Sequence, residues 1–156
     1  VVGIDPGLVH TGVVRLVFDR AAKHVTVGYT VVLGADAGVV AEWTEAPGLP
    51  KPAIFIEEYK VYHQYATNSE MVAAVRKLKE ATGGKVLSPL GVKQLVKPQV
   101  MRLLKVWTFT KVTHHQDLRS AARIAIVGML KDDEANKLLA DLVRDHLNGQ
   151  TWQVDA

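Results

Sequence analysis

Three consecutive segments rich in Val and Thr restrict the fold of this chain more than any other feature. They occupy residues 1–5, roughly 11–19 and roughly 24–33, and the short sequences DPGL and DRAAK separate them. Segments of this composition between turn residues are typical of β-strands, and short connections favour antiparallel pairing. The pattern therefore predicts an antiparallel meander at the start of the chain.

The rest of the chain alternates between strand and helix patterns. The expected elements are, in chain order, a short helix at 36–45, a strand at 53–59, a helix at 68–81, a short strand at 85–89, helical or turn-like basic segments at 91–105, and helices at 114–130 and 133–147. Thr67 and Glu70 have the spacing of a capping box, which predicts that Thr67 caps the third of these elements. The order predicts an α/β fold with a mixed five-stranded sheet, its first three strands antiparallel, flanked by helices and formed by residues 1–156 as a single domain.

Composition narrows the kinds of partner and cofactor that we expect. The longest apolar run is broken by Gly and Asp and is too short to span a bilayer, so no membrane partner and no signal peptide are expected. The chain has no cysteine, which suits a reducing cytoplasm, or the host cytoplasm if the source is viral, and leaves carboxylate, carbonyl or His as metal ligands. The net charge of +3 permits an anionic partner such as nucleic acid.

Three carboxylates interrupt otherwise apolar segments: Asp5 follows VVGI, Glu57 follows AIFI, and Asp117 precedes the apolar run of its helix. A carboxylate at the edge of an apolar strand is costly to desolvate, so it needs a cation, a metal or capping amides. Three such acids in adjacent elements repel one another, and Mg²⁺ or Mn²⁺ relieves that repulsion. Period-two alternation selects Glu57 over Glu58, because Glu57 shares a strand face with Phe55.

Each of these residues also has a purely structural interpretation. Asp5 is equally suited to cap the turn at Pro6 and Gly7 as an Asx-turn residue. Asp117 is a first-turn acid that favours the helix dipole, and His114 or His115 suits a solvent-exposed helix start. Because His114 and Asp117 are three residues apart, they share a helix face.

Four segments together resemble the RuvC family of Holliday junction resolvases over about residues 1–130. GIDPGLVHTG, AIFIEE and HHQDLRSAARIAI resemble its three acidic motifs, in the same order and at similar separations, and KQLVKPQVMRLL resembles the basic stretch between the last two. The resemblance implies a ribonuclease H-like fold, a homodimer, and metal-dependent cleavage of four-way DNA junctions in recombination and repair.

The resemblance also implies the ligands of the metal ions. The acids that match the three motifs are Asp5, Glu57 and Asp117. The family commonly adds either an acid three residues after the last of them, where this chain has Ser120, or a His three residues before it, where it has His114. Helical spacing favours His114 over His115, and Ser120 remains able to contribute through a water. A His that is not a ligand would instead assist proton transfer.

Two Mg²⁺ or Mn²⁺ ions held in this way would support phosphodiester hydrolysis to 5′-phosphate and 3′-hydroxyl ends by paired symmetric nicks. Two alternatives stay open on the same fold. One is a nuclease of broader specificity for branched DNA. The other is a junction-binding module without catalysis, to which Ser120 gives some support.

Basic and aromatic residues supply candidate DNA contacts. The expected contacts are Lys93, Lys97 and Arg102, with Lys105 on the same side of the basic segment, and Lys60 and Tyr62 just after Glu57. The resemblance matches Lys93 and Lys97 to basic residues that contact the junction backbone. A solvated basic face is the alternative interpretation of this segment.

Overall fold

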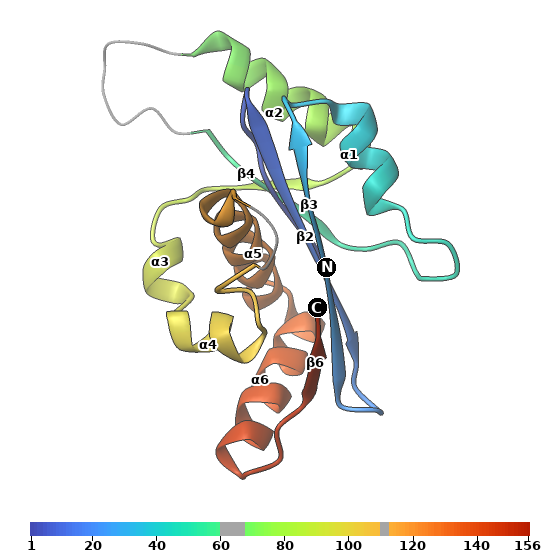
Figure 1. Ribbon diagram of the computed structural model, residues 1–156, viewed down its shortest axis with the longest axis vertical. Helices are drawn as coiled ribbons and strands as arrows, with labels where there is room; N and C mark the ends of the chain where they lie inside the picture. Colours follow the sequence, from blue (N-terminus) through green and yellow to red (C-terminus); the bar gives the residue numbers. More distant parts are fainter. Residues whose placement is uncertain (60–67, 110–112) are drawn as a thin grey trace.

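The computed structural model describes residues 1–59, 68–109 and 113–156. Within these ranges, strands and helices follow one another in nearly the order that the sequence predicts (Figure 1). The strands are β1 (Val2–Asp5), β2 (His10–Asp19), β3 (His24–Leu33), β4 (Ile54–Glu57), β5 (Lys85–Leu87) and β6 (Gln153–Asp155). The helices are α1 (Ala37–Thr44), α2 (Ser69–Thr82), α3 (Val92–Leu95), α4 (Pro98–Leu103), α5 (His115–Leu130) and α6 (Asp133–Leu147).

The described strands form one mixed sheet in the order β5-β4-β1-β2-β3-β6. The expected meander is confirmed, because β1 to β3 pair antiparallel, whereas β4 joins β1 and β5 joins β4 in parallel. The expected count of five strands is wrong, since β6 adds a sixth strand parallel to the start of β3. β6 has three residues, too few for a period-two pattern, and its position depends on contacts distant in sequence.

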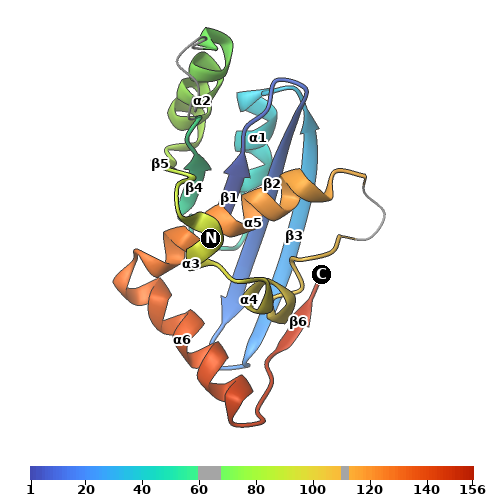
Figure 2. The same ribbon diagram turned by 90° about the vertical axis from the view of Figure 1, so that its left-hand side faces the viewer.

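Alternation along the strands divides the core between the two faces of the sheet. On one face the helices α1 and α2 cover residues such as Ile4, Val13 and Ile56. On the other face α5 crosses the sheet, with α3, α4 and α6 beside it, over residues such as Val14 and Phe55 (Figure 2). Side chains of adjacent strand positions therefore enter different layers.

The start of α2 differs from the expected capping box. Asn68, and not Thr67, is the N-cap, and its side-chain oxygen accepts hydrogen bonds from the backbone N–H groups of Glu70 and Met71. An Asn side chain is short enough to reach the free N–H groups of the first turn, so it serves as well as Thr at this position. The helix ends at Gly83, which has a left-handed backbone conformation, as the sequence predicts.

None of the helices in the described part of the chain is long and apolar enough to cross a membrane.

Candidate functional site

Asp5 and Glu57 end two neighbouring parallel strands. Register pairs Ile4 of β1 with Ile56 of β4, so the next residue on each strand lies at the same edge of the sheet. Phe55, two residues before Glu57, packs on the face that α5 covers. Alternation sends Glu57 to that face as well, as the sequence predicts, and both carboxylates are half-buried. Strand pairing alone therefore brings the first two acids together.

The close approach of α5 to the sheet brings the third acid to the same place. A Cβ atom at Gly3 would collide with the carbonyl oxygen of Ala121, so only a glycine lets the helix lie this near β1. A Cβ atom at Gly12 would lie 2.6 Å from the carbonyl oxygen of Asp117, and Gly12 is the strand partner of Asp5. Two glycines thus let α5 lie close to the sheet, Gly12 of β2 beneath its first turn and Gly3 of β1 further along the helix.

The three acids interact electrostatically. Burial, and after it the negative charges of Glu57 and Asp117, raise the pKa of Asp5 to about 8. Burial also raises the pKa of Glu57, against the opposing effect of Arg123 and Lys93. Within the described residues, no ion pair joins Asp5 or Glu57 to a basic side chain. The site therefore concentrates negative charge and binds protons or other cations readily.

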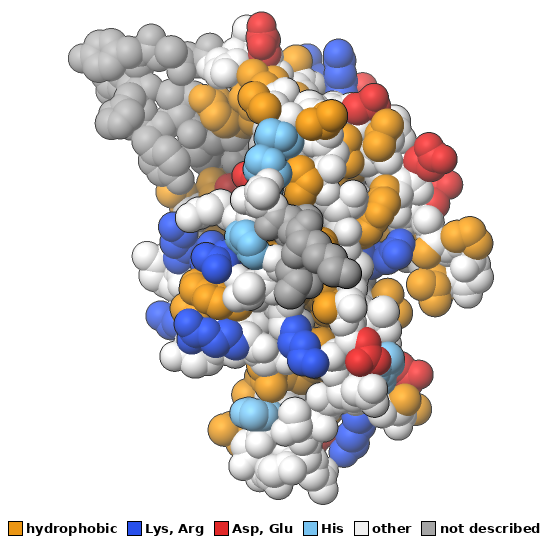
Figure 3. All heavy atoms as spheres, viewed as in Figure 1, with side chains coloured by type: hydrophobic (Ala, Val, Ile, Leu, Met, Phe, Trp, Pro, Cys, Tyr) orange, Lys and Arg blue, Asp and Glu red, His pale blue; other side chains and the backbone are white. Residues whose placement is uncertain are grey.

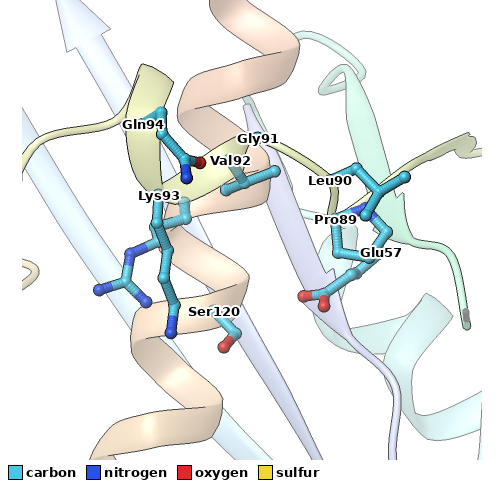
Figure 4. Close-up of a pocket in the computed structure, with 9 residues that line it drawn as sticks. Glu57, Pro89, Leu90, Gly91, Val92, Lys93, Gln94 and Ser120 are labelled. Atoms are coloured by element: carbon cyan, nitrogen blue, oxygen red, sulfur yellow. The ribbon is translucent and has the colours of Figure 1, made fainter. Parts of the chain in front are cut away.

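Two cations face Glu57 across a hollow of about 420 Å³ between β4, α3 and α5. Its polar lining comes from Glu57, Lys93, Gln94, Ser120 and Arg123. Figure 4 shows Lys93 of α3 and Ser120 of α5 pointing into the space that Glu57 reaches from β4. An open hollow with one acid and two cations at its wall is suited to a phosphate group beside a metal.

Arg123 is a site residue that the sequence analysis missed. Its Nε atom is buried and has no hydrogen-bond partner within the described residues. Burial and the nearby Arg119 lower the pKa of Arg123, whereas Glu57 opposes that shift. A buried guanidinium nitrogen without a partner is costly, so this side chain is suited to an anionic ligand. Its helical spacing, three residues after Ser120, is the signal that could have identified it.

A second group of potential ligands lies at the start of α5. Donor atoms of His10, His114 and Asp117 all lie within 4.8 Å of one another, and His114 Nδ1 is 3.8 Å from an Asp117 carboxylate oxygen. His115 is turned elsewhere, because its Nδ1 accepts a hydrogen bond of 3.1 Å from the backbone N–H of Phe109. The structure thus brings His114, the N-cap residue of α5, beside Asp117 and directs His115 into the core.

His10 is the second residue that the sequence analysis missed. It lies two positions before Gly12 on β2, and period-two alternation therefore predicts that it faces α5. This alternation was the available signal. It could not identify the histidine as a candidate ligand without the register of β1, β2 and α5.

The predicted DNA contacts of the basic segment form a surface over α3 and α4. Figure 3 shows Lys and Arg side chains gathered there, next to the acidic site. Lys93, Lys97, Arg102 and Lys105 are all exposed. Arg102 stacks on the ring of Trp107, with 5.0 Å from its Cζ to the ring centroid. The structure therefore places these cations beside the site, Lys93 within it and the others further along.

Two other predicted contacts, Lys60 and Tyr62, lie outside the described residues. Tyr59, just before them, packs against the core beneath α1 and α2. That position agrees with the structural interpretation of Tyr59.

The donors present fit a hard or borderline divalent metal ion. Mg²⁺ and Mn²⁺ prefer carboxylate oxygens, and neighbouring carboxylates with a raised pKa are what a bound cation stabilises in the ionised form. Asp5, Glu57 and Asp117 supply carboxylate oxygens, and His114 supplies a nitrogen that Mn²⁺ accepts. Among the described residues, the donor atoms within 4.8 Å of one another are those of Asp117, His114 and His10, without Asp5 or Glu57.

Comparison with known proteins finds likeness in structure and not in sequence. No protein-family model matches the chain, and no curated protein sequence matches it. Thermus thermophilus RuvC in complex with Holliday junction substrate is similar at a TM-score of 0.50 and 18% identity, over 83% of this chain and 94% of that one. A second structure of T. thermophilus RuvC has a TM-score of 0.48 and 20% identity, over 81% of this chain and 95% of that one. Fowlpox virus resolvase with its substrate Holliday junction DNA has a TM-score of 0.49 and 14% identity, over 83% of this chain and 96% of that one.

The similarity to RuvC in its junction complex confirms the expected fold class. The chain has the ribonuclease H-like fold of RuvC, with an antiparallel meander, parallel outer strands and helices on both faces.

Proposed function

We propose that this protein is a metal-dependent endonuclease that resolves four-way DNA junctions by paired symmetric nicks. One observation carries the proposal: at one end of the sheet, Asp5 of β1 is buried and lies near enough to Glu57 of β4 and Asp117 of α5 for their charges to raise its pKa further. The fold it shares with RuvC, a protein seen with Holliday junction substrate, directs the proposal to branched DNA.

In this proposal Asp5, Glu57, Asp117 and His114 would hold Mg²⁺ or Mn²⁺. Such ions would supply the Lewis acidity that activates water and stabilises the leaving 3′ oxygen in phosphodiester hydrolysis to 5′-phosphate and 3′-hydroxyl ends. The carboxylates orient the ions, and the close seating of α5 at Gly12 keeps Asp117 in position relative to Asp5.

Lys93 and Arg123 bind the phosphate that is cleaved. Both line the hollow beside Glu57, and a guanidinium with an unpaired buried nitrogen is suited to phosphate oxygens. The positive charges also offset the repulsion between the substrate and the three acids. Ser120, at the same hollow, has the position to hold a water by its hydroxyl.

Phosphates further along the DNA bind to the basic surface of α3 and α4. Lys97, Arg102 and Lys105 are exposed there, and the ring of Trp107 lies beneath Arg102. Lys60 and Tyr62 remain proposed contacts near the branch point. Because a four-way junction has approximate two-fold symmetry and two strands to cut, we propose that the active form is a homodimer, with apolar positions of α2 as interface candidates.

A synthetic four-way junction tests the proposal. The purified protein is incubated with labelled junction, linear duplex or a three-way branch, with Mg²⁺, Mn²⁺ or a chelator. Paired symmetric nicks in the junction with metal alone support a resolvase. Cuts in every branched substrate would indicate the broader nuclease, binding without nicks would indicate the inactive module, and no binding would overturn the proposal.

The basic surface is tested by the salt dependence of junction binding. Lys97→Ala should weaken binding and reduce the log–log salt slope by about 0.9, because one phosphate contact is lost. Lys137→Ala removes an equal charge from α6 and is the matched control, with an unchanged slope expected. Equal slopes for the two variants would contradict a DNA contact at Lys97.

A further inference from the structure

His10 stands at the start of β2, half-buried against the first turn of α5. Its ring centroid lies 3.9 Å from that of His114, with 33° between the ring planes. One nitrogen of each ring and one oxygen of Asp117 fall within 4.8 Å of one another. Two imidazoles and one carboxylate thus converge on a common point.

The backbone positions of β2 and α5 bring these three side chains together. β2 carries His10 and Gly12 on the same face, and a Cβ atom at Gly12 would lie 2.6 Å from the carbonyl oxygen of Asp117, so the strand and the helix approach closely here. His114 is the N-cap residue of α5, three residues before Asp117, so it lies over the same end of the helix. Strand and helix therefore hold the three donors from two directions.

We propose that His10 is a metal ligand, which forms with His114 and Asp117 a two-histidine, one-carboxylate site for a divalent transition metal. The proposal rests on the proposed function in that His114 and Asp117 belong to both. His10 adds a third metal ligand to this pair, and with it a preference for transition metals over Mg²⁺. Imidazole nitrogens favour transition metals such as Zn²⁺, and Mn²⁺ accepts them beside carboxylate oxygens, whereas Mg²⁺ prefers oxygen ligands and keeps several of its waters.

The consequence is asymmetry between the two metal positions. At the position between Asp5 and Glu57 the metal ligands offered by these two described residues are carboxylate oxygens, and so it remains suited to Mg²⁺ or Mn²⁺. The position at His10 has two nitrogen donors, and so is selective for transition metals. His10 thereby determines which metal the protein uses at this end of the site.

Metal binding without DNA tests the inference. Titration calorimetry with Mn²⁺, Zn²⁺ and Mg²⁺ is combined with pulsed electron paramagnetic resonance of the Mn²⁺ form, which reports directly bound nitrogen. Wild type should show coupling to two imidazole nitrogens. His10→Ala should show one, with Zn²⁺ affinity lowered by more than about 10-fold, since outer-shell partners alone change affinity by about 10- to 100-fold.

Two variants control for other causes. His10→Gln keeps most of the side-chain volume, and should lose the same nitrogen coupling if His10→Ala folds poorly. His146→Ala removes an exposed histidine near the end of α6 and should bind all three metals as wild type does. Mg²⁺ affinity should be nearly unchanged in every one of these variants.

An unchanged nitrogen coupling and Zn²⁺ affinity in both His10 variants would overturn the inference. This outcome leaves junction cleavage by the wild-type protein intact, and so separates the inference from the proposed function. Conversely, the protein could show nitrogen coupling to Mn²⁺ that depends on His10 and yet cleave no junction. That result would support the metal site and contradict the proposed nuclease activity.

Discussion

Two groups of carboxylates, one at the ends of β1 and β4 and the other beside the β2–β3 turn, contain acids whose pKa values are shifted in opposite directions. At the site end, burial and neighbouring acids raise the pKa of Asp5 to about 8. At the other end, beside the β2–β3 turn, a hydrogen bond from the Trp152 indole, 2.9 Å long, and the ammonium of Lys23 lower the pKa of Asp145.

The remaining acids at that end are paired as well. His24 Nε2 lies 2.7 Å from Asp155, which lowers the pKa of Asp155, and Arg20 lies 2.6 Å from Asp141. We call Asp141, Asp145 and Asp155 the paired acids, and Asp5, Glu57 and Asp117 the site acids. Both groups include buried or half-buried side chains, so burial does not separate a structural carboxylate from a functional one. The two groups differ in the hydrogen-bond and ion-pair partners that their carboxylates have within the chain.

The largest expected effect is the loss of cleavage when a site acid is neutralised. Asp5→Asn and Glu57→Gln should each lower the single-turnover rate of junction nicking by at least about 1000-fold, as for other catalytic groups that act as a unit. Junction binding should persist or strengthen, because each change removes negative charge near the phosphates. Asp145→Asn, a paired acid, is the matched control and should nick at the wild-type rate. Nicking by Asp5→Asn at the wild-type rate would contradict a catalytic role for the site acids.

A second prediction concerns stability in the presence of chelator. The pKa of Asp5 is about 8 in the folded protein against 3.8 for the free group, so the folded state holds a proton that the unfolded state releases between these values. Wild type should therefore lose stability relative to Asp5→Asn as pH rises from 4 to 8, by up to a few kcal/mol. Urea unfolding at several pH values measures the difference.

Mn²⁺ should reverse that difference, because it stabilises the ionised carboxylate in wild type and binds Asp5→Asn weakly. If the unfolding free energies of the two proteins in chelator changed in parallel with pH, the pKa of Asp5 would not be raised in the folded state.

The paired acids should show the opposite dependence on pH. The pKa values of Asp145 and Asp155 are lowered in the folded state, so the contribution of these two acids is present above 3.8 and is lost as pH falls below it. Trp152→Phe removes the indole donor to Asp145, and should lower the melting temperature at pH 7 by a few degrees. The loss should shrink at pH 3, and cleavage should be unaffected. A loss that is independent of pH would assign the effect to packing alone.

The smallest expected effect is that of an exposed ion pair. Arg20→Ala breaks the contact with Asp141, but the arginine side chain is 61% exposed. Unfolding free energy should fall by about 0.2–1 kcal/mol, as for other surface pairs, with 1 M salt removing most of the difference. A larger loss of unfolding free energy that persists in 1 M salt would show that the burial of Asp141 strengthens this ion pair.

Local pattern was sufficient to predict most of the fold. Short-range signals placed the meander, the alternating elements and the glycine end of α2, and alternation with Phe55 selected Glu57. The same signals failed at β6, whose three residues pair with β3 across more than a hundred positions of chain, and at Thr67, where the neighbouring Asn68 provides the cap.

The site was predictable in part for the same reason. An acid that interrupts an apolar segment is visible in sequence, because the cost of burying it is local. His10 and Arg123 were missed because each has meaning only beside a partner, His114 for the one and Glu57 for the other.

The sequence by itself determined which acids interrupt apolar segments, that Glu57 shares a strand face with Phe55, and that His114 and Asp117 share a helix face, since strand alternation and helical spacing are properties of neighbouring residues. Only the tertiary structure decided which cations lie near each acid. Coulomb interactions depend on distances through space, and strand pairing and the close seating of α5 set those distances between residues far apart in the chain. That is why Asp5 carries a raised pKa and Asp145 a lowered one.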